Sequence, residues 1–159
     1  AGVPISAGEL YDKYMAKSPI YKGDPWETYV GDARGNGLGC YAPCVVVTVN
    51  AYLTEIKSEK KIYDISENDF SYYEALIDDG YPVIIWGTVG MNGNNQIYWQ
   101  TNIGQKHIVW YNYSHCMVLI GYTENTYIFC DPLVGIAEYK KSDAEKSFNI
   151  TFRQACVIK

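Results

Sequence analysis

The sequence predicts an α+β fold, because helical patterns fill its first half and antiparallel strand patterns fill its second half. The chain has 159 residues, the usual length of one domain, so we expect a single domain over residues 1–159. Hydrophobic residues make up 48% and charged residues 19%, which is typical of a globular protein with a packed core. No internal repeat or linker divides the sequence.

Local signals place three helices in the first half. Ser6 and Glu9 form a capping box, in which each side chain satisfies a backbone amide of the first turn. Residues 24–27, Asp-Pro-Trp-Glu, repeat this pattern with proline at the first helical position. Residues 42–53 space their apolar side chains for a helix, although the run of valines favours a strand. Residues 31–39 contain four glycines and are expected to form a loop.

From residue 61 onward the pattern changes toward strands. A short strand is expected at 61–65, followed by a helix over 70–77 that ends at Gly80. Turn residues separate the apolar runs that follow, which predict strands at 82–86, 96–103, 107–111, 115–122, 126–130 and 155–158. Ser142 and Glu145 are expected to cap a last short helix.

Charge and hydropathy exclude several classes of protein. The net charge is −5, whereas binding to a nucleic-acid backbone needs a basic surface. No apolar run approaches the length that inserts into a membrane. We therefore expect neither a nucleic-acid partner nor membrane insertion. The 16 tyrosines are unusual and suit a partly wet binding surface.

The five cysteines do not form a recognisable metal or disulfide pattern. They lie at Cys40, Cys44, Cys116, Cys130 and Cys156. Five in 159 residues is too few for a disulfide scaffold, and an odd number leaves at least one unpaired unless two chains are joined. No spacing of cysteine or histidine matches a zinc site, so neither a metal nor a cofactor is expected.

Two ionisable residues flank one predicted hairpin. His115 opens the strand that runs to residue 122, and Asp131 ends the returning strand. A tight turn at 123–125 makes the two residues cross-strand neighbours, or at most about three residues out of register. A carboxylate that orients an imidazole is one half of a catalytic triad. Two simpler alternatives remain open: a histidine at the sheet rim and an aspartate that forms a turn before proline.

The nucleophile of such a triad is harder to find. Cys116 and Cys130 neighbour His115 and Asp131 along their strands, so their side chains point to the opposite face. Cys40 follows the glycine-rich loop and precedes a helix start, where the helix dipole lowers the pKa of a thiol. It is therefore the best candidate in this chain, with a buried loop anchor or half of a disulfide as the alternatives. Cys44 and Cys156 are expected to lie in the core. His107 is expected to be an exposed hairpin residue.

Five motifs occur in an order that identifies a family. They are Tyr29-Val30-Gly31-Asp32, Gly39-Cys40-Tyr41-Ala42-Pro43, the strand over 80–86, the strand over 115–122, and Asp131-Pro132-Leu133-Val134-Gly135. In this order, the sequence resembles the family-39-like bacterial cysteine peptidases, secreted papain-fold proteins related to bacteriocin-processing peptidases. The resemblance covers nearly the whole chain. It implies that His115 is the catalytic histidine and that Asp131 orients it.

The same resemblance also shows a departure. The family carries its nucleophile in a Gly-Cys motif on a long first helix, just after an oxyanion-hole glutamine. That helix usually ends shortly before a segment like residues 2–6 of this chain, so the sequence is expected to be truncated at its N-terminus. Cys40 corresponds to another family cysteine, to which no role is assigned.

These observations give a leading hypothesis and two rivals. The leading one is a papain-like cysteine peptidase, or an inactive remnant of one, that acts on peptides or proteins outside the cell or in the cell envelope. Alone it would be inactive unless the missing segment is supplied in trans. In the second hypothesis, Cys40 is the nucleophile and His115 is its base. In the third, the same fold is a non-catalytic module that binds peptide or cell-wall ligands, and its exposed apolar surface could also drive dimerisation.

Overall fold

The computed structural model describes residues 4–159, so Gly2 and Val3 of the predicted family segment 2–6 lie outside the described residues. The chain forms two compact units. The first unit contains the chain up to Asp64, together with residues 99–110 and 158–159. The second contains residues 65–98 and 111–157. The prediction of a single domain stays a prediction.

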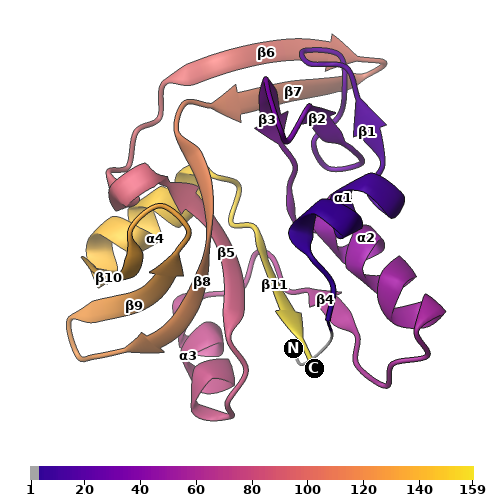
Figure 1. The fold of residues 1–159 in the computed structure, drawn as a ribbon. Helices are drawn as coiled ribbons and strands as arrows, with labels where there is room; N and C mark the ends of the chain where they lie inside the picture. Colours follow the sequence, from indigo (N-terminus) through magenta and orange to yellow (C-terminus); the bar gives the residue numbers. More distant parts are fainter. Residues whose placement is uncertain (1–3) are drawn as a thin grey trace. The chain divides into compact units, whose positions relative to one another are not determined.

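The first unit combines two helices with short strands (Figure 1). Its elements are α1 (Ala7–Lys13), β1 (Lys17–Ser18), β2 (Tyr29–Gly31), β3 (Gly37–Gly39), α2 (Ala42–Glu55) and β4 (Ile62–Asp64). Strands β1 and β2 are parallel, and β2 and β3 are antiparallel. Residues 99–110 add most of the hairpin of β6 (Ile97–Ile103) and β7 (Lys106–Tyr111). The chain end joins this unit through Lys159, which exchanges backbone hydrogen bonds with Lys61.

Two of the three helices predicted in the first half are present. The capping box begins α1 as expected, because Ser6 Oγ accepts from the amide of Glu9 and the Glu9 carboxylate accepts from the amide of Ser6. Helix α2 carries proline in its first turn, and its burial among other apolar groups overrides the strand preference of its valines.

The prediction of a helix at residues 24–27 is wrong. Asp24 makes only one turn there, in which its carbonyl accepts from the amides of Glu27 and Thr28. The chain then becomes extended, because the amide of Tyr29 donates to the carbonyl of Ala16 at 2.8 Å and pairs β2 with β1. The prediction of a loop over residues 31–39 is wrong in part, because Gly37–Gly39 forms strand β3.

The second unit is an antiparallel sheet with two helices. Its elements are α3 (Phe70–Asp78), β5 (Val83–Thr88), the 3-10 turn η1 (Val89–Met91), β8 (Ser114–Tyr122), β9 (Thr126–Asp131), β10 (Gly135–Lys140), α4 (Lys141–Ile150) and β11 (Ala155–Ile158). The strand order is β10-β9-β8-β5-β11, and each neighbouring pair is antiparallel. The sequence missed β10. It also misplaced the cap of α4, which begins at Lys141 directly after β10, with no side-chain cap from Lys140.

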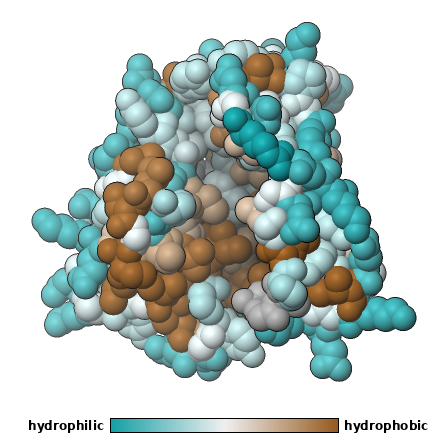
Figure 2. Space-filling view, viewed as in Figure 1, coloured by the Kyte–Doolittle hydropathy of each residue, from teal (hydrophilic) through white to brown (hydrophobic). Residues whose placement is uncertain are grey.

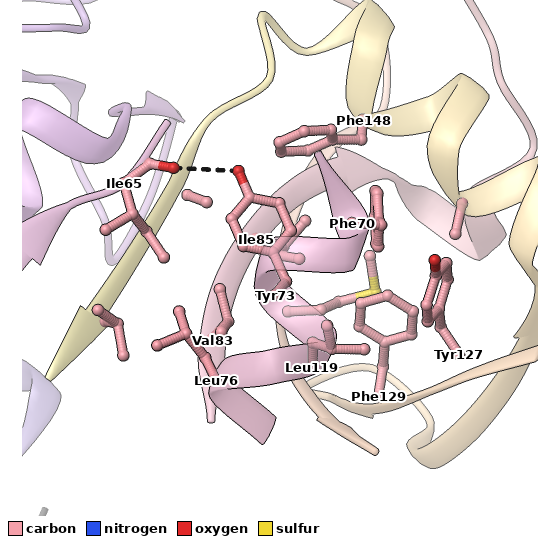
Figure 3. Close-up of a cluster of buried hydrophobic side chains, with 14 of the residues drawn as sticks. Ile65, Phe70, Tyr73, Leu76, Val83, Ile85, Leu119, Tyr127, Phe129 and Phe148 are labelled. Atoms are coloured by element: carbon pink, nitrogen blue, oxygen red, sulfur yellow. Dashed lines mark hydrogen bonds between the residues drawn. The ribbon is translucent and has the colours of Figure 1, made fainter. Parts of the chain in front are cut away.

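One face of this sheet forms the core of the second unit (Figure 3). Alternate residues of each strand enter it, as the period of two requires. They meet aromatic side chains of α3 and α4, including Phe70, Tyr73 and Phe148. The hydroxyl of the fully buried Tyr73 donates to the carbonyl of Ile65 at 3.1 Å, so this core tyrosine is also hydrogen-bonded. Because side chains alternate along a strand, burial of this face also determines which residues of β8 and β9 point toward the core.

Candidate active site

The register of β8 and β9 decides where His115 and Asp131 lie. Val118 pairs with Cys130, so the next position along β9, Asp131, lies opposite Met117. His115 is two residues from Met117 and therefore on the same face. Residues offset by two positions in this way are diagonal neighbours, within reach of long side chains.

The two side chains meet in a charge-assisted hydrogen bond. Nε2 of His115 and Oδ1 of Asp131 are 2.8 Å apart. Exposed fractions are 11% for the His115 side chain and 2% for that of Asp131. The pairing inferred from strand register is therefore present, and burial of both partners strengthens the interaction over that of a surface pair.

Two further donors hold the Asp131 carboxylate. The amide of Leu133 donates to Oδ1 at 2.8 Å, and the hydroxyl of Tyr139 donates to Oδ2 at 3.3 Å. Burial by itself raises the pKa of Asp131, but these donors and His115 outweigh it and hold the pKa below its usual range. Asp131 is therefore ionised at neutral pH.

An ionised Asp131 also settles the proton arrangement on His115. A carboxylate can only accept, so Nε2 must be the protonated ring nitrogen. Nδ1 of the neutral ring then carries a lone pair, and no hydrogen bond to it is found within residues 4–159. Such an imidazole can take a proton at Nδ1 while Asp131 stabilises the resulting charge.

Tyr139 is the site residue that the sequence analysis missed. It lies on β10, which was not predicted, and the register of β10 with β9 brings its ring toward the carboxylate. Burial first, and then the Asp131 charge, raise the pKa of Tyr139, so its hydroxyl stays a donor. The alternation of apolar and polar residues over 137–140 is the signal that could have revealed this strand.

The sequence matches the model of a known protein family. The model of the Peptidase_C39 like family matches residues 1–156. The chain belongs to this family. No curated protein matches it.

The fold agrees with that of a solved structure. A crystal structure of a C39-like peptidase from Bacillus anthracis superposes with a TM-score of 0.84 at 19% sequence identity. The match covers 99% of this chain and 81% of the other. At this identity the likeness shows the fold, and it confirms the predicted α+β, papain-like architecture.

In this member of the Peptidase_C39 like family, the thiols of the second unit are separated from the His–Asp pair. Cys116 and Cys130 lie on the sheet face opposite His115 and Asp131, as strand alternation predicts. Burial raises the pKa of Cys116 to about 12, so this thiol stays protonated. Cys130 is exposed, whereas Cys156 is fully buried in β11. None of these three is hydrogen-bonded to His115 in the described structure.

The remaining candidates lie in the first unit. Cys40 directly precedes Tyr41, the N-cap of α2, and is 9% exposed. It contacts Cys44, and its pairing with His115 stays a prediction. His107 is exposed, as expected, and its Nδ1 is 3.0 Å from the amide oxygen of Asn102.

Among residues 4–159, no three or more His, Cys, Asp or Glu side chains gather closely enough to share a metal ion. Nor is any helix of this described part long and apolar enough to cross a membrane.

Exposed apolar side chains surround the carboxylate end of the site. Leu133, Val134 and Ile136 are 64%, 67% and 66% exposed, although each is aliphatic. Figure 2 shows apolar surface gathered over this hairpin of the second unit. Solvent-exposed groups of this kind often mark a binding surface.

Proposed function

We propose that His115 and Asp131 are the base and its orienting carboxylate in a cysteine-peptidase site that hydrolyses peptide bonds. The observation that carries this is the 2.8 Å bond between Nε2 of His115 and Oδ1 of the buried Asp131. Membership of the Peptidase_C39 like family supports the same chemistry.

The proposed reaction follows from the proton arrangement. Nδ1 of His115 takes the proton of a cysteine thiol, and the thiolate attacks the carbonyl carbon of the scissile bond. His115 then returns the proton to the leaving amine nitrogen as the C–N bond breaks, which leaves a thioester. In the second half, Nδ1 takes a proton from water, and the hydroxide attacks the thioester carbonyl and displaces the thiolate. The carboxylic acid product is released, and the thiolate recovers its proton from Nδ1. Asp131 keeps the ring oriented throughout.

The identity of the nucleophile is the finer part of the proposal. Because no thiol of the second unit is placed or protonated suitably, we propose that the 159-residue chain by itself has no appreciable peptidase activity. The alternative is that Cys40 serves as nucleophile, favoured by its position at the start of α2.

A small external thiol can test the role of His115 without a nucleophile in the chain. Methanethiol and an activated ester would be mixed with the wild type and with His115→Ala. If His115 is a general base, the wild type accelerates thiolysis of the ester by at least about tenfold over the variant. Equal rates would argue against the His–Asp pair as a peptidase base.

Hydrolysis of a quenched peptide library tests the nucleophile. The wild type, Cys40→Ala and His115→Ala should be equally inactive. Cleavage by the wild type that both substitutions abolish would establish Cys40 as the nucleophile. Cleavage that survives Cys40→Ala would show that the chain is active through another thiol. Labelling with an epoxysuccinyl thiol inhibitor, measured by intact mass, provides the same distinction.

A second candidate function is a non-catalytic module for peptide or cell-wall ligands. The exposed side chains of Leu133, Val134 and Ile136 favour it, because an enzyme gains nothing from exposed aliphatic groups that touch no ligand. Calorimetric titration with apolar peptides and with cell-wall fragments would detect such binding. Leu133→Asp should weaken it at least about tenfold if the surface is used, since a carboxylate is costly to desolvate.

Two accompanying proposals concern location and assembly. Family membership supports a protein that works outside the cell or in the cell envelope. The apolar surface supports either a dimer or a segment bound in trans. Cell fractionation and sedimentation at several concentrations test these two proposals separately.

A further inference from the structure

Two of the five cysteines lie together at the start of α2. Cys40 is the residue before the N-cap Tyr41, and Cys44 lies in the first turn of the helix. Their thiols are hydrogen-bonded to each other. Both residues are buried, with exposed fractions of 9% for Cys40 and 2% for Cys44. The proposed His–Asp chemistry of the second unit gives this pair no role.

We propose that Cys40 and Cys44 are a redox pair that closes to an intramolecular disulfide when the protein meets an oxidant. The inference is independent of the proposed function, since it involves neither His115 nor Asp131. It assigns a modification site to the Gly-Cys-Tyr-Ala-Pro-Cys segment, whose two cysteines the leading proposal does not use.

The local geometry suits a disulfide. Cys40 and Cys44 lie four residues apart at the start of α2, and their thiols are within hydrogen-bond reach of each other. A hydrogen bond joins the two thiols, so closure requires the sulfur atoms to approach from hydrogen-bond distance to covalent distance. Cys40 lies outside the helix, and its backbone can adjust without breaking the hydrogen bonds of α2.

The local chemistry suits it as well. The hydrogen bond from Cys40 lowers the pKa of Cys44, and Thr48 adds to this, while burial opposes it. The free amides at a helix start also favour a thiolate. Cys44 is therefore the more nucleophilic thiol of the pair.

A peroxide is the oxidant that fits a buried pair, because it is small. The Cys44 thiolate attacks one oxygen of hydrogen peroxide, the O–O bond breaks, and the products are a sulfenic acid and hydroxide. The Cys40 sulfur then attacks the Cys44 sulfur, and the Cys44 oxygen leaves with the Cys40 proton as water. Two thiols are oxidised to one disulfide, and one peroxide is reduced to two water molecules.

The other cysteines provide built-in comparisons. Cys116 and Cys130 share a sheet face but are two positions out of register, because Cys130 pairs with Val118. Burial also raises the pKa of Cys116 to about 12, which removes its thiolate at neutral pH. Cys156 is fully buried in β11.

Peptide mapping of the wild-type protein tests the proposal directly. Trypsin places Cys40 and Cys44 in the peptide 35–57, Cys116 and Cys130 in 107–140, and Cys156 in 154–159. The folded protein is treated with hydrogen peroxide, denatured, alkylated with iodoacetamide, and digested. Peptide 35–57 should lose the mass of two hydrogen atoms and carry no alkyl group. Treatment with dithiothreitol before alkylation should restore both alkyl groups.

Several results would overturn the proposal. They are two alkyl groups on peptide 35–57 after peroxide, or Cys40 or Cys44 linked to another peptide. Because the wild type is used, no variant has to fold for this test. As a further check, Cys40→Ala should leave Cys44 alkylatable or oxidised without a disulfide, whereas the matched change Cys156→Ala should leave the oxidation of peptide 35–57 unchanged.

Discussion

The His115–Asp131 pair and the Cys40–Cys44 pair are assembled in different ways. The first joins residues 16 apart in sequence, on two strands whose register must be correct. The second joins residues four apart at the start of α2, so local structure brings the thiols together. The catalytic candidate therefore depends on the sheet, whereas the redox candidate depends on the helix start.

The two faces of the β8–β9 hairpin sharpen this difference. One face continues from His115 and Asp131 into the packed core through Met117 and Phe129. The other carries Cys116 and Cys130, together with exposed Ile136 on the neighbouring strand β10. Because side chains alternate along a strand, the same register that joins the His–Asp pair keeps both thiols away from it.

The largest expected effect tests the packed face. Phe129→Ala removes a fully buried ring and should lower the free energy of unfolding by about 4 kcal/mol. Urea denaturation followed by circular dichroism measures this change. The matched control is Ile136→Ala on the exposed face, which should cost no more than about 0.5 kcal/mol. Similar losses for both variants would contradict the assignment of the two faces.

Removing the buried carboxylate comes next. Asp131→Ala leaves the donors on Leu133, Tyr139 and His115 without their acceptor, and should cost about 3 kcal/mol of unfolding free energy. Asp79→Asn, at an exposed aspartate that ends α3, is the control and should cost less than about 0.5 kcal/mol. A loss for Asp131→Ala as small as that of the control would mean that the pair stabilises nothing.

The pH dependence of stability should reveal the same carboxylate. Its pKa in the folded protein lies below the value of about 3.9 for an unfolded chain, so the unfolded state takes up the proton first. The stabilisation is therefore complete above about pH 4 and is lost as the pH falls through the folded pKa. The urea midpoint of the wild type should fall more between pH 6 and pH 3 than that of Asp131→Asn, which cannot titrate there. Parallel falls would contradict this.

The smallest expected effect concerns Tyr139. Tyr139→Phe removes only the hydroxyl that donates to Oδ2 at 3.3 Å, and should cost about 1 kcal/mol. The pKa of Asp131, measured by carbon NMR of its carboxyl group, should rise because one donor to the charged form is lost. Tyr72→Phe, at an exposed tyrosine of α3, is the control and should leave that pKa unchanged. An unchanged pKa in Tyr139→Phe would show that the hydroxyl does not position the carboxylate.

Prediction from sequence succeeded where a signal was local or strictly periodic. The Ser6–Glu9 capping box, helix α2 and the β8–β9 hairpin all follow from residues close together in sequence. It failed at residues 24–27, where pairing with β1 replaced a helix by a single turn. It also missed β10, a short edge strand whose two faces are exposed or only half-buried, and so missed Tyr139.

By itself, the sequence predicted the fold class and the family, which are confirmed, and the pairing of His115 with Asp131, which the structure shows. These predictions were possible because they rest on local patterns: the residues that cap a helix, the spacing of apolar residues in a strand, and the order of motifs along the chain. Only the tertiary structure decided the strand register and the donors around Asp131. These depend on which distant surfaces pack together, and that is set by burial of the whole core rather than by any one segment.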